Sequence, residues 1–330
     1  MKIDIVIDGS FGDCGKGKVV HHLLKTGNYT HCLRGSAGNN CGHTIYHNGK
    51  KFITHSIPAG VFFGVKSIIG SGCVVNPTHL LSEIKYLTDN GIDCNKIIKV
   101  AYNAHIITEK HIAEDALDTK IGTTKRGIGQ AYRDKYSRNG IRAENISELK
   151  EYLCDLYDEI FNAKSEPNII YEGAQGFGLD IDHGDYPYVT SSHTTVAGAL
   201  LNGIPHTAIN NVYLVCKAYE TYVGLKKFQP DNNQDLIKIQ KLGNEVGATT
   251  NRVRQCNYLN ITTLKKAVQI NAASHIIINK MDILQKSEVW KIIANNEILD
   301  LKSEDKFVDY IKEQFKEIPN IHFSYSPEKI

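Results

Sequence analysis

Asp13 stands in a loop whose other residues suit a phosphate ligand. The loop, Gly12 to Lys18, follows an apolar stretch, Ile3 to Ile7, that predicts a buried strand, and a helix is expected from Lys16 to Lys25. A glycine loop between a strand and a helix turns backbone N–H groups toward phosphate, although no Ser or Thr follows the lysine as in a Walker A motif. A carboxylate here would repel phosphate unless it held a metal ion or moved a proton. The alternative is a strand-to-helix turn that binds nothing.

His43 is the second residue that could do chemistry. It lies in a loop of small residues, Arg34 to Thr44, which follows a predicted strand from Tyr29 to Leu33. A lone histidine is more often structural than catalytic. However, the flanking glycines and the preceding pair of asparagines make this loop open to close approach by a ligand. Asp13 and His43 together could act as a general base and a general acid.

Two later loops have the composition of anion sites. Residues 121–129 combine hydroxyl, cationic and glycine residues, which suits a phosphate group. Residues 247–254 place two threonines before Arg252 and Arg254, and alternate arginines on an extended segment point the same way and fit a dicarboxylate. Either loop could instead be a solvated surface segment. Residues 180–192 hold several Asp and His residues, but their Tyr-Pro-Tyr and Thr-Ser-Ser runs favour a pocket wall over a metal cluster.

The segment Asn279 to Asp282 matches the NKxD signature by which GTP-binding proteins read guanine. It follows a predicted strand, His275 to Ile278. The carboxylate of this signature accepts from the N1–H and 2-amino groups of guanine, a donor pair that adenine lacks. The segment from Phe323 to Pro327 stands in the right order to close over a base.

Predicted strands alternate with predicted helices along the whole chain. This favours one α/β domain, residues 1–330, with a mainly parallel central sheet flanked by helices and resembling a P-loop NTPase. Such sheets bind ligands at the carboxyl ends of their strands, where most of the loops above begin. The remaining pattern predicts a helix from His79 to Leu87 capped by Thr78, a strand from Ile97 to Ile107 and an amphipathic helix from Ser147 to Asn162.

Charge and composition exclude several classes of partner. The chain has 38 basic and 36 acidic residues among 330, so no whole-protein field favours nucleic acid. The N-terminal residues do not have the form of a signal peptide, and no apolar stretch is long enough to span a membrane. The eight cysteines contain no CxxC pair, which predicts neither a zinc site nor a disulfide framework. We therefore expect a cytoplasmic protein that binds small molecules.

Six stretches taken together resemble the adenylosuccinate synthetase family, in the family's order and across the chain. The resemblance implies that the protein joins IMP to L-aspartate and spends GTP, giving adenylosuccinate, GDP and phosphate through a 6-phosphoryl-IMP intermediate. The length is similar to that of the compact members, which lack insertions found in the longer ones. The matching stretches are residues 12–18, 39–44, 121–135, 172–192, 247–254 and 279–282.

The resemblance also implies a role for individual residues. Asp13 would take the proton from N1 of IMP, His43 would stabilise phosphoryl transfer, and Mg²⁺ would bind Asp13 and Gly42. Arg138 would reach the IMP of the other subunit, which implies a homodimer. The nucleotide site would be built from residues 9–18, 279–282 and 324–327. The GTP residues would be Gly12, Gly15, Lys16, Gly17, Lys18, Gly42, Thr44, Arg254, Lys280, Asp282, Ser324 and Ser326. The IMP residues would be Asp13, Asn40, Thr124, Arg138, Gln175, Thr190, Val223 and Arg252. The aspartate residues would be Thr249, Thr250, Arg252 and Arg254.

The chain departs from the family pattern at several positions. Cys14 stands where the family usually has Glu, and Asp8 stands where it has a small Gly. Residues 221–229, 251–254 and 324–330 also differ. One alternative is a relative similar to the phage enzymes that add aspartate to dGMP, with ATP as a possible donor; the presence of Asp13 favours IMP. Another is a GTP-binding switch without ligase activity, in which residues 172–192 and 247–254 would have no purpose.

Overall fold

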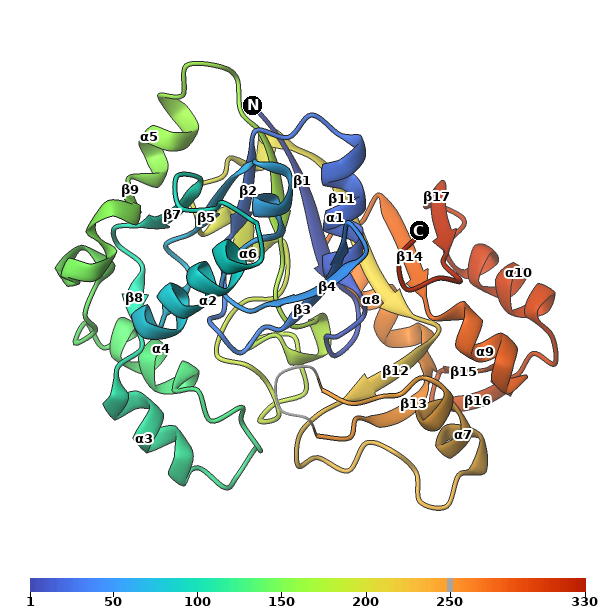
Figure 1. Cartoon of the computed structure of the whole chain (residues 1–330). Helices are drawn as coiled ribbons and strands as arrows, with labels where there is room; N and C mark the ends of the chain where they lie inside the picture. The colour runs from blue at the N-terminus through green and yellow to red at the C-terminus, as the bar shows by residue number, and fades with distance from the viewer. Residues whose placement is uncertain (248–251) are drawn as a thin grey trace.

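Strand β1 lies near the centre of a nine-stranded sheet in this computed structural model, which describes residues 1–247 and 252–330. The strands are β1 Lys2–Asp8, β2 His31–Arg34, β5 Lys66–Ile69, β7 Ile98–Ala101, β9 Leu153–Cys154, β10 Asn168–Glu172, β11 Ile209–Lys217, β14 His275–Asn279 and β17 Asn320–Phe323. Their order across the sheet is β17-β14-β11-β1-β10-β2-β5-β7-β9. Every neighbouring pair in this sheet is parallel. The predicted α/β class with a parallel central sheet is therefore confirmed (Figure 1).

Helices cover both faces of this sheet. They are α1 Lys16–Thr26, α2 Pro77–Asp89, α3 Glu109–Leu117, α4 Ile128–Tyr136, α5 Leu156–Phe161, α6 Ala197–Leu200, α7 Gln234–Leu242, α8 Ile261–Ile270, α9 Met281–Ser287 and α10 Glu304–Gln314. Ile3, Ile5 and Ile7 of β1 point into one hydrophobic core with residues of α7 to α10, and Val6 points into another with residues of α1 and α2. Strands buried on both faces are mostly apolar, which is why the run from Ile3 to Ile7 was recognisable although Asp4 interrupts it.

Smaller elements and smaller sheets, separate from the central sheet, complete the fold. The 3-10 helices are η1 Ala59–Phe63, η2 Ala143–Asn145, η3 Ser147–Tyr152, η4 Phe177–Leu179 and η5 His206–Ala208. The remaining strands are β3 His43–His47, β4 Lys50–Thr54, β6 Val74–Val75, β8 His105–Ile106, β12 Tyr219–Tyr222, β13 Gln255–Asn260, β15 Lys291–Ala294 and β16 Glu297–Asp300. Strands β12, β13, β15 and β16 form one sheet, seen at the lower right of Figure 1 beside α7. β3 and β4 form a hairpin that begins at His43.

The amphipathic helix predicted from Ser147 to Asn162 is wrong. The segment forms η3, the edge strand β9 and the short helix α5. Leu149 is buried in the core with α1 and α2, whereas Leu156 and Ile160 are buried in the core on the other side of the sheet. The apolar residues have helical spacing, but the chain crosses the edge of the sheet between them and divides them between two cores.

Two other local predictions need correction. The helix expected at His79 begins earlier, because the Asn76 side chain accepts from the backbone N–H of His79 at 2.9 Å and caps α2, with Pro77 as its first residue. Thr78 is therefore not the cap. The strand expected from Ile97 to Ile107 is divided into β7 and β8, which belong to different sheets.

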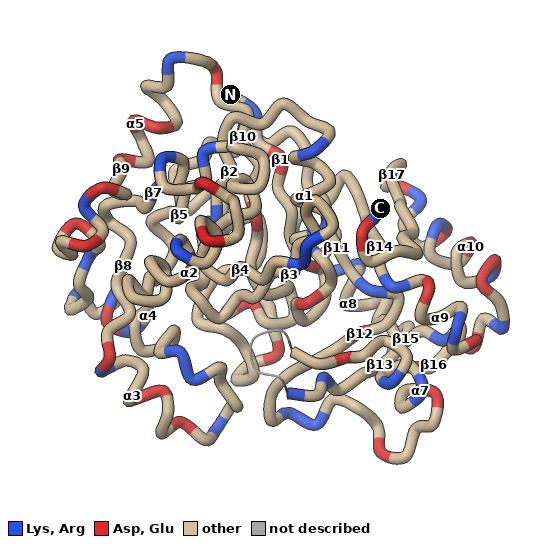
Figure 2. Tube along the Cα trace, viewed as in Figure 1, with Lys and Arg blue, Asp and Glu red and all other residues tan. Residues whose placement is uncertain are grey.

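Charged residues of both signs are distributed over the elements (Figure 2), in agreement with the formal net charge of +2. Among the described residues, no helix is both long enough and apolar enough to cross a membrane.

Candidate active site

A cavity of about 490 Å³ lies among the loops that follow β1, β2 and β10. Because the central strands are parallel, these loops meet at one edge of the sheet. Fifteen of the predicted site residues line this cavity. They are Gly12, Asp13, Gly15, Lys16, Gly17, Asn40, Gly42, His43, Thr44, Thr124, Gln175, Thr190, Val223, Arg252 and Arg254.

The loop after β1 forms one wall of the cavity. Gly12, Asp13 and Gly15 have positive φ angles of 87°, 57° and 94°, which fold the loop back toward the start of α1. Since α1 begins at Lys16, its first N–H groups have no acceptor within the helix. Lys16 and Gly17 line the cavity at this point. This is the arrangement expected of a phosphate-binding loop.

Asp13 is held by an arginine from a distant part of the chain. Its carboxylate lies 2.9 Å from Nε and 2.8 Å from Nη2 of Arg254. Arg254 also donates from Nη1 to Glu245 at 2.6 Å. The predicted base and a predicted ligand of aspartate are thus in direct contact. Asp13 remains 39% exposed, so a ligand in the cavity can reach it.

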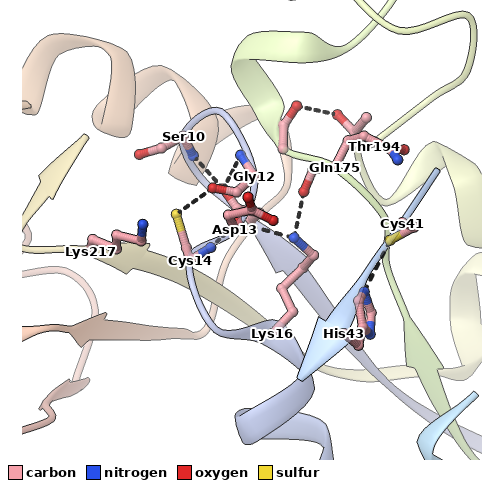
Figure 3. A network of polar contacts seen from close by, with 12 residues as sticks. Ser10, Gly12, Asp13, Cys14, Lys16, Cys41, His43, Gln175, Thr194 and Lys217 are labelled. Carbon is pink, nitrogen blue, oxygen red and sulfur yellow. Dashed lines mark hydrogen bonds and ion pairs between the residues drawn. The ribbon is translucent and has the colours of Figure 1, made fainter. Parts of the chain in front are cut away.

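His43 lies between the carboxylate of Glu172 and the thiol of Cys41, and Figure 3 shows its contact with Cys41. Its Nε2 is 3.0 Å from Sγ of Cys41. Its Nδ1 faces Glu172 and lies 3.0 Å from Nη2 of Arg34. Glu172 also accepts from Arg34 at 2.5 Å and from the backbone N–H of Ala59 at 2.8 Å. These neighbours fix the orientation of the imidazole at the wall of the cavity.

Burial and charge act in opposite directions on this cluster. Burial raises the pKa of the Cys41 thiol, but His43 and Arg34 lower it, to about 6. Burial lowers the pKa of the His43 imidazole, but the Cys41 thiolate and the Glu172 carboxylate raise it, to about 8. Burial also opposes ionisation of Glu172, yet Arg34 and His43 hold its pKa well below the usual range. The arrangement favours an imidazolium beside a thiolate near neutral pH.

Cys41, Arg34 and Glu172 were not among the predicted site residues. All three lie inside stretches that the sequence singled out, but nothing in their spacing shows that they meet. Arg34 ends β2 and Glu172 ends β10, and the two strands are neighbours in the sheet. Their contact depends on a pairing between residues 138 positions apart.

The residues predicted to hold guanine form a separate group outside the described lining of the cavity. Lys18 donates to Oγ of Ser324 at 2.7 Å and to the carbonyl of Ser326 at 2.9 Å. The side chain of Asn279 donates to the carbonyl of Cys14 at 2.7 Å, which joins the NKxD segment to the loop after β1. Lys280 and Asp282 lie at the start of α9, directly after Asn279.

The remaining predicted residues differ in whether they lie at the cavity. Arg252 donates to the carbonyl of Gly122 at 3.1 Å and so connects two of the predicted loops. Arg138 is exposed just beyond the end of α4 and is not part of the cavity lining of its own chain. Thr249 and Thr250 lie outside the described residues.

Asp180 anchors the segment that follows it. Asp180, Asp182 and His193 could approach a common ion, but Asp180 is buried and accepts from three backbone N–H groups of its own segment, including that of Thr194 at 2.6 Å. This use of the carboxylate supports the interpretation as a pocket wall.

The predicted magnesium ligands have suitable chemistry. Asp13 and Gly42 line the same cavity. A carboxylate and a peptide carbonyl are oxygen donors of the kind that Mg²⁺ prefers. The donor set therefore fits the ion.

The family model of adenylosuccinate synthetase matches residues 5–165 and 144–326. This chain belongs to the adenylosuccinate synthetase family. The adenylosuccinate synthetase of Thermodesulfovibrio yellowstonii is 36% identical, over 88% of this chain and 80% of the relative. The family membership confirms the resemblance drawn from the six stretches.

Two solved structures are similar to this one over nearly the whole chain. The fully ligated adenylosuccinate synthetase from Plasmodium falciparum has a TM-score of 0.87 and 26% identity, covering 99% of this chain and 98% of that chain. The succinoaminodeoxyadenylate synthetase of cyanophage S-2L, bound to dGMP and dATP as an energy donor, has a TM-score of 0.79 and 19% identity, covering 99% and 93%. The second likeness shows the shared fold.

We expect Arg34→Met to lower the free energy of unfolding by about 3–5 kcal/mol, because it removes the guanidinium that is paired with the buried carboxylate of Glu172. Urea unfolding followed by circular dichroism measures the difference from the unsubstituted protein. Lys85→Met, which removes an exposed pair with Asp89 on α2, is the control and should change stability little. Equal losses in the two variants would contradict a special role for the Arg34–Glu172 pair.

Proposed function

We propose that this protein catalyses the GTP-dependent ligation of L-aspartate to IMP, giving adenylosuccinate, GDP and phosphate. Membership of the family over most of the chain supports a ligase that forms a C–N bond. The observation that carries the proposal is the cavity, in which residues assigned to all three substrates meet: Asp13 and Gln175 for IMP, Lys16 for GTP and Arg254 for aspartate.

In the first step the chain activates IMP. Asp13 takes the proton from N1, and O6 attacks the γ-phosphorus of GTP. The O6–P bond forms as the bond from that phosphorus to the β-phosphate oxygen breaks, which releases GDP. Lys16 and protonated His43 offset the negative charge of the phosphoryl group during its transfer. Asp13 and Gly42 would hold Mg²⁺, which would supply further neutralisation of the phosphate charge.

In the second step the neutral amino group of aspartate attacks carbon 6, the C6–O6 bond breaks as phosphate leaves, and the new amine gives its extra proton to the departing phosphate. Arg252 and Arg254 hold the carboxylates of aspartate, because a guanidinium matches a carboxylate in a two-point contact. Arg254 is paired with Asp13 before substrate arrives. A substrate carboxylate that takes this place exchanges one anion for another and frees Asp13 to accept the IMP proton.

The base of GTP is read by the separate group around Asp282. Its carboxylate accepts from N1–H and the 2-amino group of guanine, which excludes adenine. Lys18, Ser324 and Ser326 close this side of the nucleotide.

All eight cysteines of the chain are free thiols, which supports a cytoplasmic, reducing location.

Purified protein with Mg²⁺ should release phosphate only when IMP, GTP and aspartate are all present. Replacing IMP by dGMP or GMP, and GTP by ATP, separates this reaction from that of a dGMP-specific relative. Asp13→Asn removes the base and one predicted ligand of Mg²⁺, so it should abolish turnover; GTP binding should stay measurable, because the other residues assigned to GTP are unchanged. Phosphate release that does not depend on aspartate would contradict the proposed reaction and favour a GTP-binding switch.

The fall of the reaction rate at alkaline pH should reflect the loss of the proton from His43. The imidazolium is present below its raised pKa of about 8 and is lost as pH rises through that value. Cys41→Ala removes the thiolate that raises this pKa, so the limb should move to lower pH by about one unit. Initial rates at saturating substrate across pH 6–10 measure this shift of the alkaline limb. Cys94→Ala, a buried thiol away from the cavity, is the control; the same profile in both variants would exclude the coupling.

We also propose a homodimer in which Arg138 contacts the IMP of the other protomer. Arg138→Leu should raise KM for IMP about tenfold through loss of a charged contact to phosphate. Its neighbour Arg142→Leu is the matched control and should leave KM unchanged. Mixing equal amounts of Arg138→Leu and inactive Asp13→Asn should restore about a quarter of the activity at low IMP, because about half of the dimers are mixed and half of the sites in a mixed dimer are complete. No recovery with stable mixed dimers would contradict the shared site.

A further inference from the structure

The carboxylate of Asp8 is enclosed by the loop that it precedes. Asp8 ends β1 and is 1% exposed. Its Oδ1 accepts from the backbone N–H of Ser10 at 2.9 Å and of Gly12 at 3.2 Å. Its Oδ2 accepts from the N–H of Cys14 at 3.2 Å and from Nζ of Lys16 at 3.1 Å. Four donors of one loop thus converge on an anion that belongs to the chain itself.

Lys16 depends on this carboxylate for its charge. The side chain of Lys16 is 5% exposed, and the other contact of its ammonium group is the carbonyl of Gln175 at 2.5 Å (Figure 3). Burial lowers the pKa of Lys16, but Asp8 raises it above its ordinary value. Asp8 is the largest of the neighbours that raise this pKa, ahead of Cys41 and Cys14, so without Asp8 the buried lysine would lose its proton more readily. Asp8 therefore keeps a cation at the wall of the cavity before any phosphate arrives.

The side chain at position 14 is affected by the charges of both Asp8 and Lys16. Cys14 is buried, and its thiol donates to the carbonyl of Gly12 at 3.3 Å. Burial raises the pKa of this thiol, the Asp8 carboxylate raises it further, and Lys217 and Lys16 lower it. A carboxylate placed at position 14 would face the same two lysines and would be repelled by Asp8. The family pattern has the acidic residue at position 14 and glycine at position 8, so this chain carries the same charge at the other position.

We propose that Asp8 is the positioning residue of the phosphate loop, which holds Lys16 protonated and fixes the loop that carries Asp13, in place of an acidic side chain at position 14. The inference rests on the proposed function, since Lys16 is assigned there to the phosphates of GTP. Asp8 is buried and is not among the residues that line the cavity: three of its hydrogen bonds orient the backbone between Ser10 and Cys14, and the fourth orients the ammonium group of Lys16.

The experiment compares Asp8→Gly, Cys14→Glu and the double variant Asp8→Gly/Cys14→Glu. Loss of the charged contacts should lower kcat/KM for GTP by about 10- to 100-fold in Asp8→Gly. Cys14→Glu alone should also lose activity, because it buries a second carboxylate beside Asp8. The double variant should recover to within about fivefold of the unsubstituted protein, since neighbouring sites are not additive. A double variant as poor as the product of the two single effects would overturn the proposal.

Asp8→Asn tests the charge with little change of shape. It keeps an acceptor for the loop N–H groups but removes the charge that raises the pKa of Lys16. GTP binding, measured by equilibrium dialysis, should therefore weaken at a lower pH than in the unsubstituted protein. Asp4→Asn is the matched control: Asp4 is a buried carboxylate at the other end of β1, bound by Tyr29 at 2.6 Å and Asn210 at 2.9 Å. It should leave the pH dependence of binding unchanged.

The outcomes separate the two hypotheses. If the unsubstituted protein does not turn over IMP, GTP and aspartate, the proposed function fails, while the dialysis still tests Asp8. If it turns over and Asp8→Asn binds GTP with the same pH dependence as Asp4→Asn, the role of Asp8 fails and the function stands. Thermal unfolding identifies a variant that does not fold. If Asp8→Gly is such a variant, Asp8→Asn alone tests the role of Asp8.

Discussion

Burial of charge at the carboxyl ends of the central strands is the constraint on which the site depends. Asp8 ends β1, Glu172 ends β10, Arg34 ends β2 and Lys217 ends β11, and all four are buried. A buried charge is costly unless it is paired and hydrogen-bonded. Each of these residues has an opposite charge in contact: Lys16 for Asp8, Arg34 for Glu172 and Glu245 for Lys217. The pairs determine where the loops run.

The same pairing extends outward to the residues that would do chemistry. Glu172 and Arg34 hold His43, and Glu245 holds Arg254, which holds Asp13. The partners of each reactive side chain are therefore more deeply buried than the side chain itself. Such a supporting layer restricts the reactive groups to a few orientations, which is how a site reduces the cost of arranging them during the reaction.

The sequence was sufficient for the elements that are regular and for the loops with unusual composition. The run from Ile3 to Ile7 predicted β1 because a strand buried on both faces is mostly apolar, and Asp4 is the one charged residue in it. The segment from Ser147 to Asn162 failed because a helical spacing does not reveal which core each residue enters. The glycine loop and His43 were found by residue type. Arg34 and Glu172 were missed because strand register, which no local pattern contains, brings them together.

The bond from Asn279 to the carbonyl of Cys14 has a consequence for the length of the ligand that fits. It connects the segment that would read the base to the loop that would hold the phosphates. Because this hydrogen bond restrains the two parts relative to each other, it limits changes in the separation between the base and phosphate positions. Under the proposed function, a nucleoside diphosphate held by its base cannot move forward to occupy the place of the missing γ-phosphate. After the reaction, GDP would therefore leave the place of the γ-phosphate empty, and that place is the one nearest to IMP.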